Sequence, residues 1–159
     1  MNEINGYDVE DLHLGMRATS SKTITEADIV LFAAVSGDNN AIHVNEEFAA
    51  TTRFGGRIAH GFLTASVISA AVANRLPGPG TIYLSQQLNF RAPVRIGQTV
   101  HASVSVSAID RERRRVTLDA ICRVGETVVI DGQALVMTTS SAKRLPILSA
   151  TVAPALSLV

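Results

Sequence analysis

The sequence predicts an α+β domain in which an antiparallel β-sheet wraps one long central helix. Residues 57–76 form the first pattern. From Gly61 to the end of this segment, the residues are apolar or small on almost every side, which is typical of a helix buried in a core. The segment 100–108 alternates apolar and polar residues with the period of a half-buried strand, and 116–120 resumes this pattern. Because helical patterns precede the strands, we expect a sheet packed against a helix.

Length and composition bound the class of protein. A chain of 159 residues suggests one domain, which we place at residues 1–142, followed by a tail of unknown role at 143–159. Fourteen basic residues balance fourteen acidic ones, and Trp is absent, so no basic field or aromatic platform favours nucleic acid. Cys122 is the only cysteine, which excludes an intramolecular disulfide. The polar, acidic N-terminus is unlike a secretory signal, so we expect a cytoplasmic protein.

The first half of the chain carries helix signals. Thr25 followed by Glu26 and Asp28 is typical of an N-cap with an acidic first turn, and Gly37 suits a left-handed C-cap. Asn45 has the same capping pattern. In order, we expect a weak first strand at 16–23, a helix from 26 to 36, a loop at 38–43, a short helix at 46–53 and a turn at 54–56.

The central helix is expected to begin near His60 and Gly61 and to be buried on all sides. A run of Leu, Pro and Gly at 76–80 ends it. Polar residues interrupt the segment, which argues against the apolar stretch that a membrane span needs, so we expect no membrane insertion. These interruptions are Thr64, Ser66, Ser69 and Asn74.

The second half of the chain reads as a strand meander. The segment 81–94 is expected to be a strand with Leu84, Leu88 and Phe90 in the core. Gly132 is a candidate β-bulge. The remaining elements are expected to be strands at 100–108, 116–120 and 128–139, a hairpin tip at 110–115 and a turn at 125–126.

Asp38 and His43 form the first candidate site. They lie five positions apart in one expected loop, and both side chains can exchange protons near neutral pH when their surroundings tune them. The spacing also fits a simpler interpretation, in which Asp38 caps a loop and a backbone carbonyl satisfies His43. The spacing alone does not decide between these interpretations.

Gly61 forms the second candidate site. A glycine in the first turn of a buried helix offers an unhindered N–H at the positive end of the dipole, where it can hold a developing oxyanion. Alternatively, Gly61 only permits close packing. Ser66 and Ser69 are polar positions on the same helix, and such serines commonly bond to their own helix. Basic residues near turns are candidates for an anionic head group or are simply solvated, namely Arg57, Arg75, Arg91 and Arg95.

One continuous stretch resembles a known family. The segment SGDNNAIHVNEEFAATTRFGGRIAHGFLTAS resembles the signature of the MaoC-like hydratases, the (R)-specific enoyl-CoA hydratases. The resemblance extends over residues 12 to 140 and departs at Ala41, where the family usually has proline. The matching positions are Ser36, Gly37, Asp38, Asn40, His43, Phe48, Ala49, His60, Gly61, Phe90, Pro93, Val94 and Gly97.

The resemblance implies a hot-dog fold, usually as a homodimer, and the reversible syn addition of water to a trans-2-enoyl-CoA thioester. It implies Asp38 and His43 as the catalytic pair and Gly61 as the oxyanion donor, with Asn40 and Ser69 in support. It also implies that no metal or organic cofactor is required. Two other functions stay open: a hot-dog acyl-CoA thioesterase, and a non-catalytic acyl-CoA-binding subunit.

Overall fold

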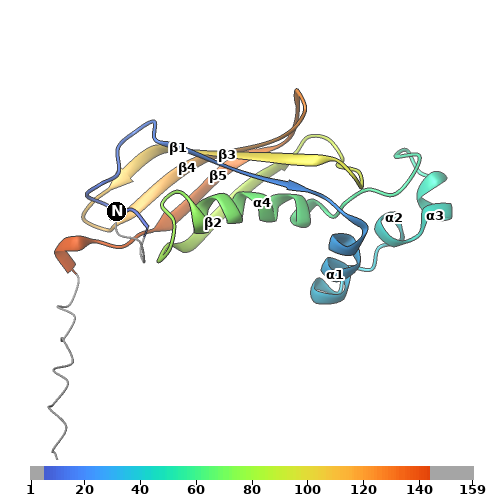
Figure 1. The fold of residues 1–159 in the computed structure, drawn as a ribbon, viewed down its shortest axis with the longest axis horizontal. Helices are drawn as coiled ribbons and strands as arrows, with labels where there is room; N and C mark the ends of the chain where they lie inside the picture. The colour runs from blue at the N-terminus through green and yellow to red at the C-terminus, as the bar shows by residue number, and fades with distance from the viewer. Residues whose placement is uncertain (1–5, 144–159) are drawn as a thin grey trace, which may run out of the picture.

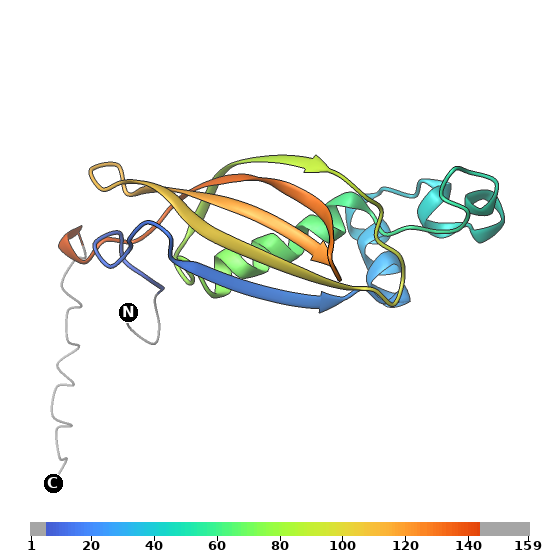
Figure 2. The same cartoon turned by 90° about the horizontal axis from the view of Figure 1, so that it is seen from above.

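The computed structural model describes residues 6–143, and one curved antiparallel sheet dominates it. In this part of the chain the sheet has five strands, and α4 (Gly61–Asn74) runs along its inner face (Figures 1 and 2). The architecture is the predicted hot-dog fold. The strands lie in the order β1 (Arg17–Thr23), β3 (Thr99–Asp110), β4 (Arg115–Val124), β5 (Thr127–Met137) and β2 (Ile82–Phe90).

Three shorter helices gather beyond the end of the sheet at which α4 begins (Figure 1). They are α1 (Glu26–Ser36), α2 (Ala41–Val44) and α3 (Glu46–Ala50), and a 3₁₀ turn at Ser141–Lys143 ends the described chain. From residue 144 onward, the predicted tail lies outside the described residues. Within residues 6–143, no helix is both long and apolar enough to cross a bilayer.

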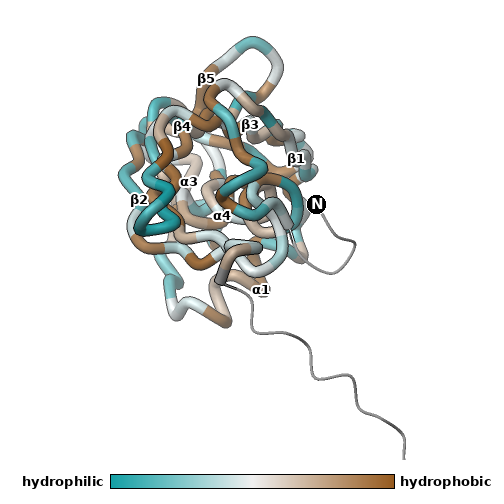
Figure 3. The backbone as a smooth tube through the Cα atoms, turned by 90° about the vertical axis from the view of Figure 1, so that its left-hand side faces the viewer, coloured by the Kyte–Doolittle hydropathy of each residue, from teal (hydrophilic) through white to brown (hydrophobic). Residues whose placement is uncertain are grey.

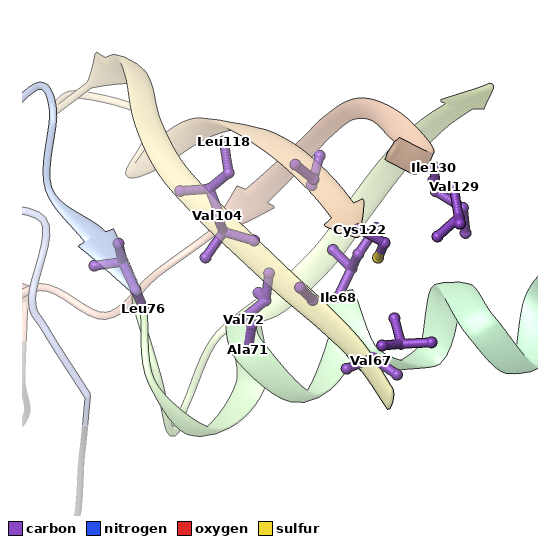
Figure 4. Packing of buried hydrophobic residues seen from close by; sticks show 14 of the residues in the cluster. Val67, Ile68, Ala71, Val72, Leu76, Val104, Leu118, Cys122, Val129 and Ile130 are labelled. Atoms are coloured by element: carbon purple, nitrogen blue, oxygen red, sulfur yellow. The ribbon is translucent and has the colours of Figure 1, made fainter. Parts of the chain in front are cut away.

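The core forms between one face of α4 and strands β1, β3 and β4. Ile68 and Val72 of α4 pack under Val104 and Leu118, and Cys122 is fully buried in the same cluster (Figure 4). The period-two alternation predicted for 100–108 is confirmed from Val100 to Val106, where alternate residues of β3 are buried, but it is wrong at Ala108, which is exposed because the register shifts between Val106 and Ala108. The tube in Figure 3 accordingly alternates between hydrophobic and hydrophilic along the strands.

The predicted helix caps are confirmed. Thr25 caps α1 through a reciprocal pair with Asp28, in which the Thr25 hydroxyl accepts from the Asp28 N–H at 3.2 Å. Gly37 ends α1 with a left-handed φ of 76°, and Asn45 caps α3. The expected loop at 38–43 is partly wrong, because the chain forms α2 from Ala41, so His43 lies on a short helix.

Two burial predictions are wrong in the protomer. The helix α4 is not buried on all sides, because Phe62 is 68% exposed. Leu84 and Phe90 of β2 are exposed as well, and only Leu88 packs against the core. The reason is topological: β2 is an edge strand, and α4 packs against β1, β3 and β4. One side of α4 and most of β2 therefore have no cover within the protomer.

Gly132 does not form the bulge that the sequence suggested. It pairs in regular register with Leu88 on one side and Ala120 on the other. The irregularity between β4 and β5 lies instead between Cys122 and Arg123. A Cβ atom on Gly132 would lie 2.0 Å from the Gln87 carbonyl oxygen. Glycine is required here because the neighbouring backbone approaches too closely for any side chain.

We therefore expect Gly132→Ala to destabilise the fold by about 1–3 kcal/mol, because the added methyl must push two strands apart. Thermal unfolding should show a Tm lower by roughly 2–4 °C for each kcal/mol lost. Thr127→Ala, at an exposed position of the same strand, is the control and should change stability by less than about 0.5 kcal/mol. Equal melting of the two variants would contradict the close-approach explanation.

Candidate active site

Asn40 connects the two predicted catalytic residues. Its side-chain oxygen accepts from the Ile42 N–H at 3.2 Å and so caps α2, while its carbonyl accepts from the His43 N–H at 2.9 Å. The Asn40 N–H lies 3.3 Å from Asp38 Oδ1 and donates to it. Asn40 therefore fixes the start of the helix that carries His43 and contacts the Asp38 carboxylate.

A main-chain carbonyl determines which ring nitrogen of His43 carries the hydrogen. Its buried ring places Nδ1 2.9 Å from the carbonyl oxygen of Ile58. A carbonyl only accepts, so Nδ1 carries the hydrogen and the neutral ring leaves Nε2 with a free lone pair. Asp38 Oδ2 lies 4.0 Å from that Nε2, which is too far for a direct hydrogen bond. The structure thus brings the predicted pair together as two facing acceptors.

His60 lies directly beneath this pair, although the sequence gave no reason to assign a role to its side chain. Its ring faces the His43 ring with centroids 3.9 Å apart, and Nε2 donates to the Asp38 carbonyl oxygen at 3.0 Å. Burial lowers the pKa of His60, and the neighbouring His43 lowers it further against an opposing effect of the Asp38 carbonyl. The one feature of the sequence that could have pointed to His60 is its place in the family pattern, immediately before Gly61.

Gly61 opens α4 with an N–H that no hydrogen bond found in residues 6–143 uses. It lines one pocket together with His43, Phe54, Thr64 and Phe90. A Cβ atom at Gly61 would lie 2.8 Å from the Phe90 ring, so glycine also serves close packing. Both predicted interpretations of Gly61 therefore hold: the position needs a small residue, and it presents a free donor at a helix N-terminus beside His43.

Ser69 does not reach this pocket within one protomer. It lies eight residues beyond Gly61 on α4, roughly 12 Å along the helix axis. Its exposed side chain lines a separate groove with Phe62 and Tyr83. The supporting role of Ser69 stays a prediction. Ser66, in contrast, donates to the Leu63 carbonyl at 2.6 Å, as expected for a serine that bonds to its own helix.

Arginines near the pocket differ in their partners. Arg57 pairs with Glu26 and Glu46, Arg91 pairs with Asp131, and Arg95 donates to the Phe54 carbonyl. Arg75 lies at the other end of α4. Arg53, which the sequence did not single out, is exposed at the pocket lining, and its guanidinium lies 4.9 Å from the Phe54 ring centroid. No ion pair of Arg53 occurs within residues 6–143.

The ligand atoms of Asp38, His43 and His60 lie within 4.8 Å of one another, so we tested whether the cluster fits a metal. Two imidazoles that share an ion converge on it with their nitrogens. Here the two ring centroids are 3.9 Å apart and the ring planes are inclined by 32°. Because a nitrogen lone pair lies in the plane of its ring, stacked rings do not direct their lone pairs at one common point. His60 Nε2 also already donates to a carbonyl. The arrangement fits proton transfer better than metal ligation.

Comparison with known proteins gives concordant matches. The MaoC like domain family matches residues 12–129. A 3-hydroxybutyryl-CoA dehydratase of Methylorubrum extorquens is 54% identical over 127 residues, 80% of this chain and 81% of that protein. An (R)-specific enoyl-CoA hydratase of Rhodospirillum rubrum is 53% identical over 128 residues, covering 80% and 89%.

A solved structure agrees with these sequence matches. The unliganded R-hydratase PhaJ1 of Pseudomonas aeruginosa superposes with a TM-score of 0.80 at 40% identity, covering 86% of this chain and 88% of that one. The family match spans most of the chain, and the relatives are matched over most of their own length. The chain therefore belongs to the MaoC-like family of hot-dog proteins.

Proposed function

We propose that the chain is an (R)-specific enoyl-CoA hydratase, a hydro-lyase that reversibly adds water to trans-2-enoyl-CoA and gives (R)-3-hydroxyacyl-CoA. The observation that carries the proposal is the 4.0 Å separation between Asp38 Oδ2 and His43 Nε2. Both atoms accept hydrogen bonds, so a water between them donates both of its hydrogens and keeps a lone pair for the substrate. The activities named for the two relatives described above are the same reaction in one or other direction.

The chemistry follows from where charge develops. A thioester carbonyl that is polarised makes its β-carbon electrophilic, and the Gly61 N–H is the donor available to stabilise the enolate-like oxygen. Water attacks the β-carbon while Asp38 or His43 removes its proton. The group that took this proton then delivers it to the α-carbon from the same side, because it lies on the face of the substrate that the water attacks. Addition is therefore syn.

We propose that this reaction needs no metal or organic cofactor. Asp38 and His43 supply the base, which becomes the acid once it has taken the proton of the water, and the Gly61 N–H supplies the oxyanion donor. Arg53 at the pocket lining supports an anionic head group on the substrate, as the phosphates of coenzyme A require. We also expect the enzyme in the cytoplasm, where such charged thioesters are retained.

We further propose that the enzyme is a homodimer joined along β2. This edge strand leaves one row of backbone groups without a neighbouring strand, and its exposed side chains include the apolar Ile82, Leu84 and Phe90. The groove between α4 and β2 is lined mainly by apolar atoms. A second copy of the same edge fits both properties, since it offers a matching strand and a matching apolar surface. The exposed apolar side chains are Phe62, Ile82, Leu84 and Phe90.

Asp38→Asn and His43→Gln test the proposed function. Each should lower kcat by at least ~10²-fold, because each removes one acid–base group, and the double variant should be little worse than either single one. Loss of enoyl absorbance from crotonyl-CoA, in the presence of a chelator, measures hydration. The product's chirality should be (R).

A thiol-release assay on the same samples separates the alternatives. Release of free coenzyme A without hydration would indicate a thioesterase, and binding without turnover would indicate a non-catalytic subunit. Near-normal turnover of either single variant would refute the assignment of the pair.

Gly61→Pro tests the oxyanion donor. The backbone tolerates proline here, because His60 has φ −59° and ψ 138°, the extended region that a residue before proline prefers. The variant should fold but lose ~10²-fold or more in kcat, the usual effect of removing one donor. Gly61→Ala keeps the N–H and displaces the Phe90 ring, so it should retain more activity. Wild-type turnover in folded Gly61→Pro would mean that another group polarises the carbonyl.

The homodimer is tested by sedimentation at micromolar concentration, where we expect twice the protomer mass. Leu84→Lys places a charge on the exposed apolar edge and should shift the sedimentation toward monomer. Val35→Lys makes the same chemical change on α1, where Val35 is 88% exposed, and should leave the assembly intact. A wild-type monomer, or equal behaviour of both variants, would count against an interface along β2.

A further inference from the structure

His60 occupies the N-cap position of α4 but does not cap the helix. N-cap side chains commonly accept from the first free N–H groups of their helix, and His60 makes no such bond. Its ring instead extends to the carbonyl of Asp38, 22 positions earlier in the chain, at 3.0 Å. One hydrogen bond therefore joins the loop that carries the catalytic carboxylate to the helix end that carries the Gly61 N–H.

That bond fixes the protonation of His60. Since a carbonyl only accepts, Nε2 must carry the hydrogen, and the buried Nδ1 is left without a partner. A protonated ring would bury a second, unpaired N–H together with a positive charge, which is unfavourable. The charged or titratable side chains near the ring are Asp38 on the loop and His43 on α2, while α1 contributes the uncharged Phe32. His60 is accordingly a neutral donor.

Two aromatic rings also pack against the His60 ring. Phe32 of α1 lies against it with ring centroids 4.9 Å apart, and His43 of α2 lies against it at 3.9 Å. The His43 ring is then restrained twice: at its edge by the Ile58 carbonyl, and on its face by His60. His60 thus contacts each part of the machinery, namely the main chain of Asp38, the ring of His43 and, as its direct neighbour, Gly61.

We propose that His60 is a positioning residue, which as a neutral Nε2–H donor holds the Asp38–His43 pair in register with the Gly61 N–H. The expected effect of this positioning on kcat rests on the proposed hydratase activity, whereas the Nε2–H tautomer of His60 does not. Register matters because the attacked β-carbon and the polarised oxygen belong to one rigid enoyl thioester. A small displacement of the loop relative to α4 misplaces the water even when every catalytic group is present.

Two variants separate the donor from the ring. His60→Gln keeps an amide N–H near the position of Nε2, and His60→Phe keeps the ring's volume and stacking but has no donor. We expect His60→Phe to lose about tenfold or more in kcat with KM changed by less than about threefold, since the group acts on geometry and not on substrate binding. His60→Gln should recover to within about threefold of wild type. Unchanged kcat in folded His60→Phe, or equal damage in both variants, would overturn the proposal.

A measurement on the wild-type chain keeps the proposal testable if a variant fails to fold. Nitrogen NMR of ¹⁵N-histidine-labelled protein should show His60 as the Nε2–H tautomer, with a pKa below the ordinary histidine value of about 6.5. The exposed His13 and His101 provide internal comparison. An Nδ1–H tautomer, or titration of His60 at the ordinary value, would overturn the proposal. Absence of hydration by wild type with the expected His60 spectrum would instead refute the proposed function alone.

Discussion

The packing of α4 against one side of the curved sheet is the constraint on which the rest of the structure depends. The helix buries Ile68, Val72 and their neighbours under β1, β3 and β4, and this burial fixes both its axis and its first residue. Gly61 then presents its N–H at the end of the sheet, where α1 to α3 gather (Figure 1). The site is located at this end because α4, the longest helix within residues 6–143, begins there.

Two main-chain carbonyls determine which ring nitrogen carries the hydrogen in each histidine of the site. The Ile58 carbonyl decides which nitrogen of His43 is free, and the Asp38 carbonyl decides which nitrogen of His60 carries a hydrogen. Side-chain identity alone leaves both tautomers open. Which nitrogen of His43 is free to act as a base therefore depends on the main chain of Ile58, whose own side chain has no part in the proposed reaction. A change that moves the Ile58 backbone is expected to affect the site directly.

Local signals in the sequence predicted the elements well where neighbouring residues decide the outcome. Thr25, Gly37 and Asn45 act within one turn of their own position, and the alternation of β3 depends on a single buried face, so each is visible in the chain itself. Which side of α4 is covered depends instead on strand order, which no local pattern contains. For this reason the burial of Leu84 and Phe90 was predicted wrongly in the protomer.

The same distinction applies to the site. The family resemblance predicted Asp38, His43 and Gly61 as site residues, and the structure places His43 and Gly61 on one pocket with the Asp38 carboxylate beside His43. The sequence did not indicate the side-chain role of His60, because its partner carbonyl lies far away in the chain. It also did not indicate the close approach at Gly132, which depends on a strand that pairs with it from a distant segment.

The single thiol of the chain has a practical consequence. Cys122 is fully buried in the core, and burial raises its pKa to about 12, so the reactive thiolate is scarce as well as inaccessible in the native protein (Figure 4). Alkylation therefore requires that the sheet open from the helix. Because the chain has no other cysteine, the labelling rate reports the population of the open state, or the opening rate when alkylation is faster than reclosing. Cys122 can therefore serve as a native labelling probe for exposure of the core, so that no probe needs to be introduced.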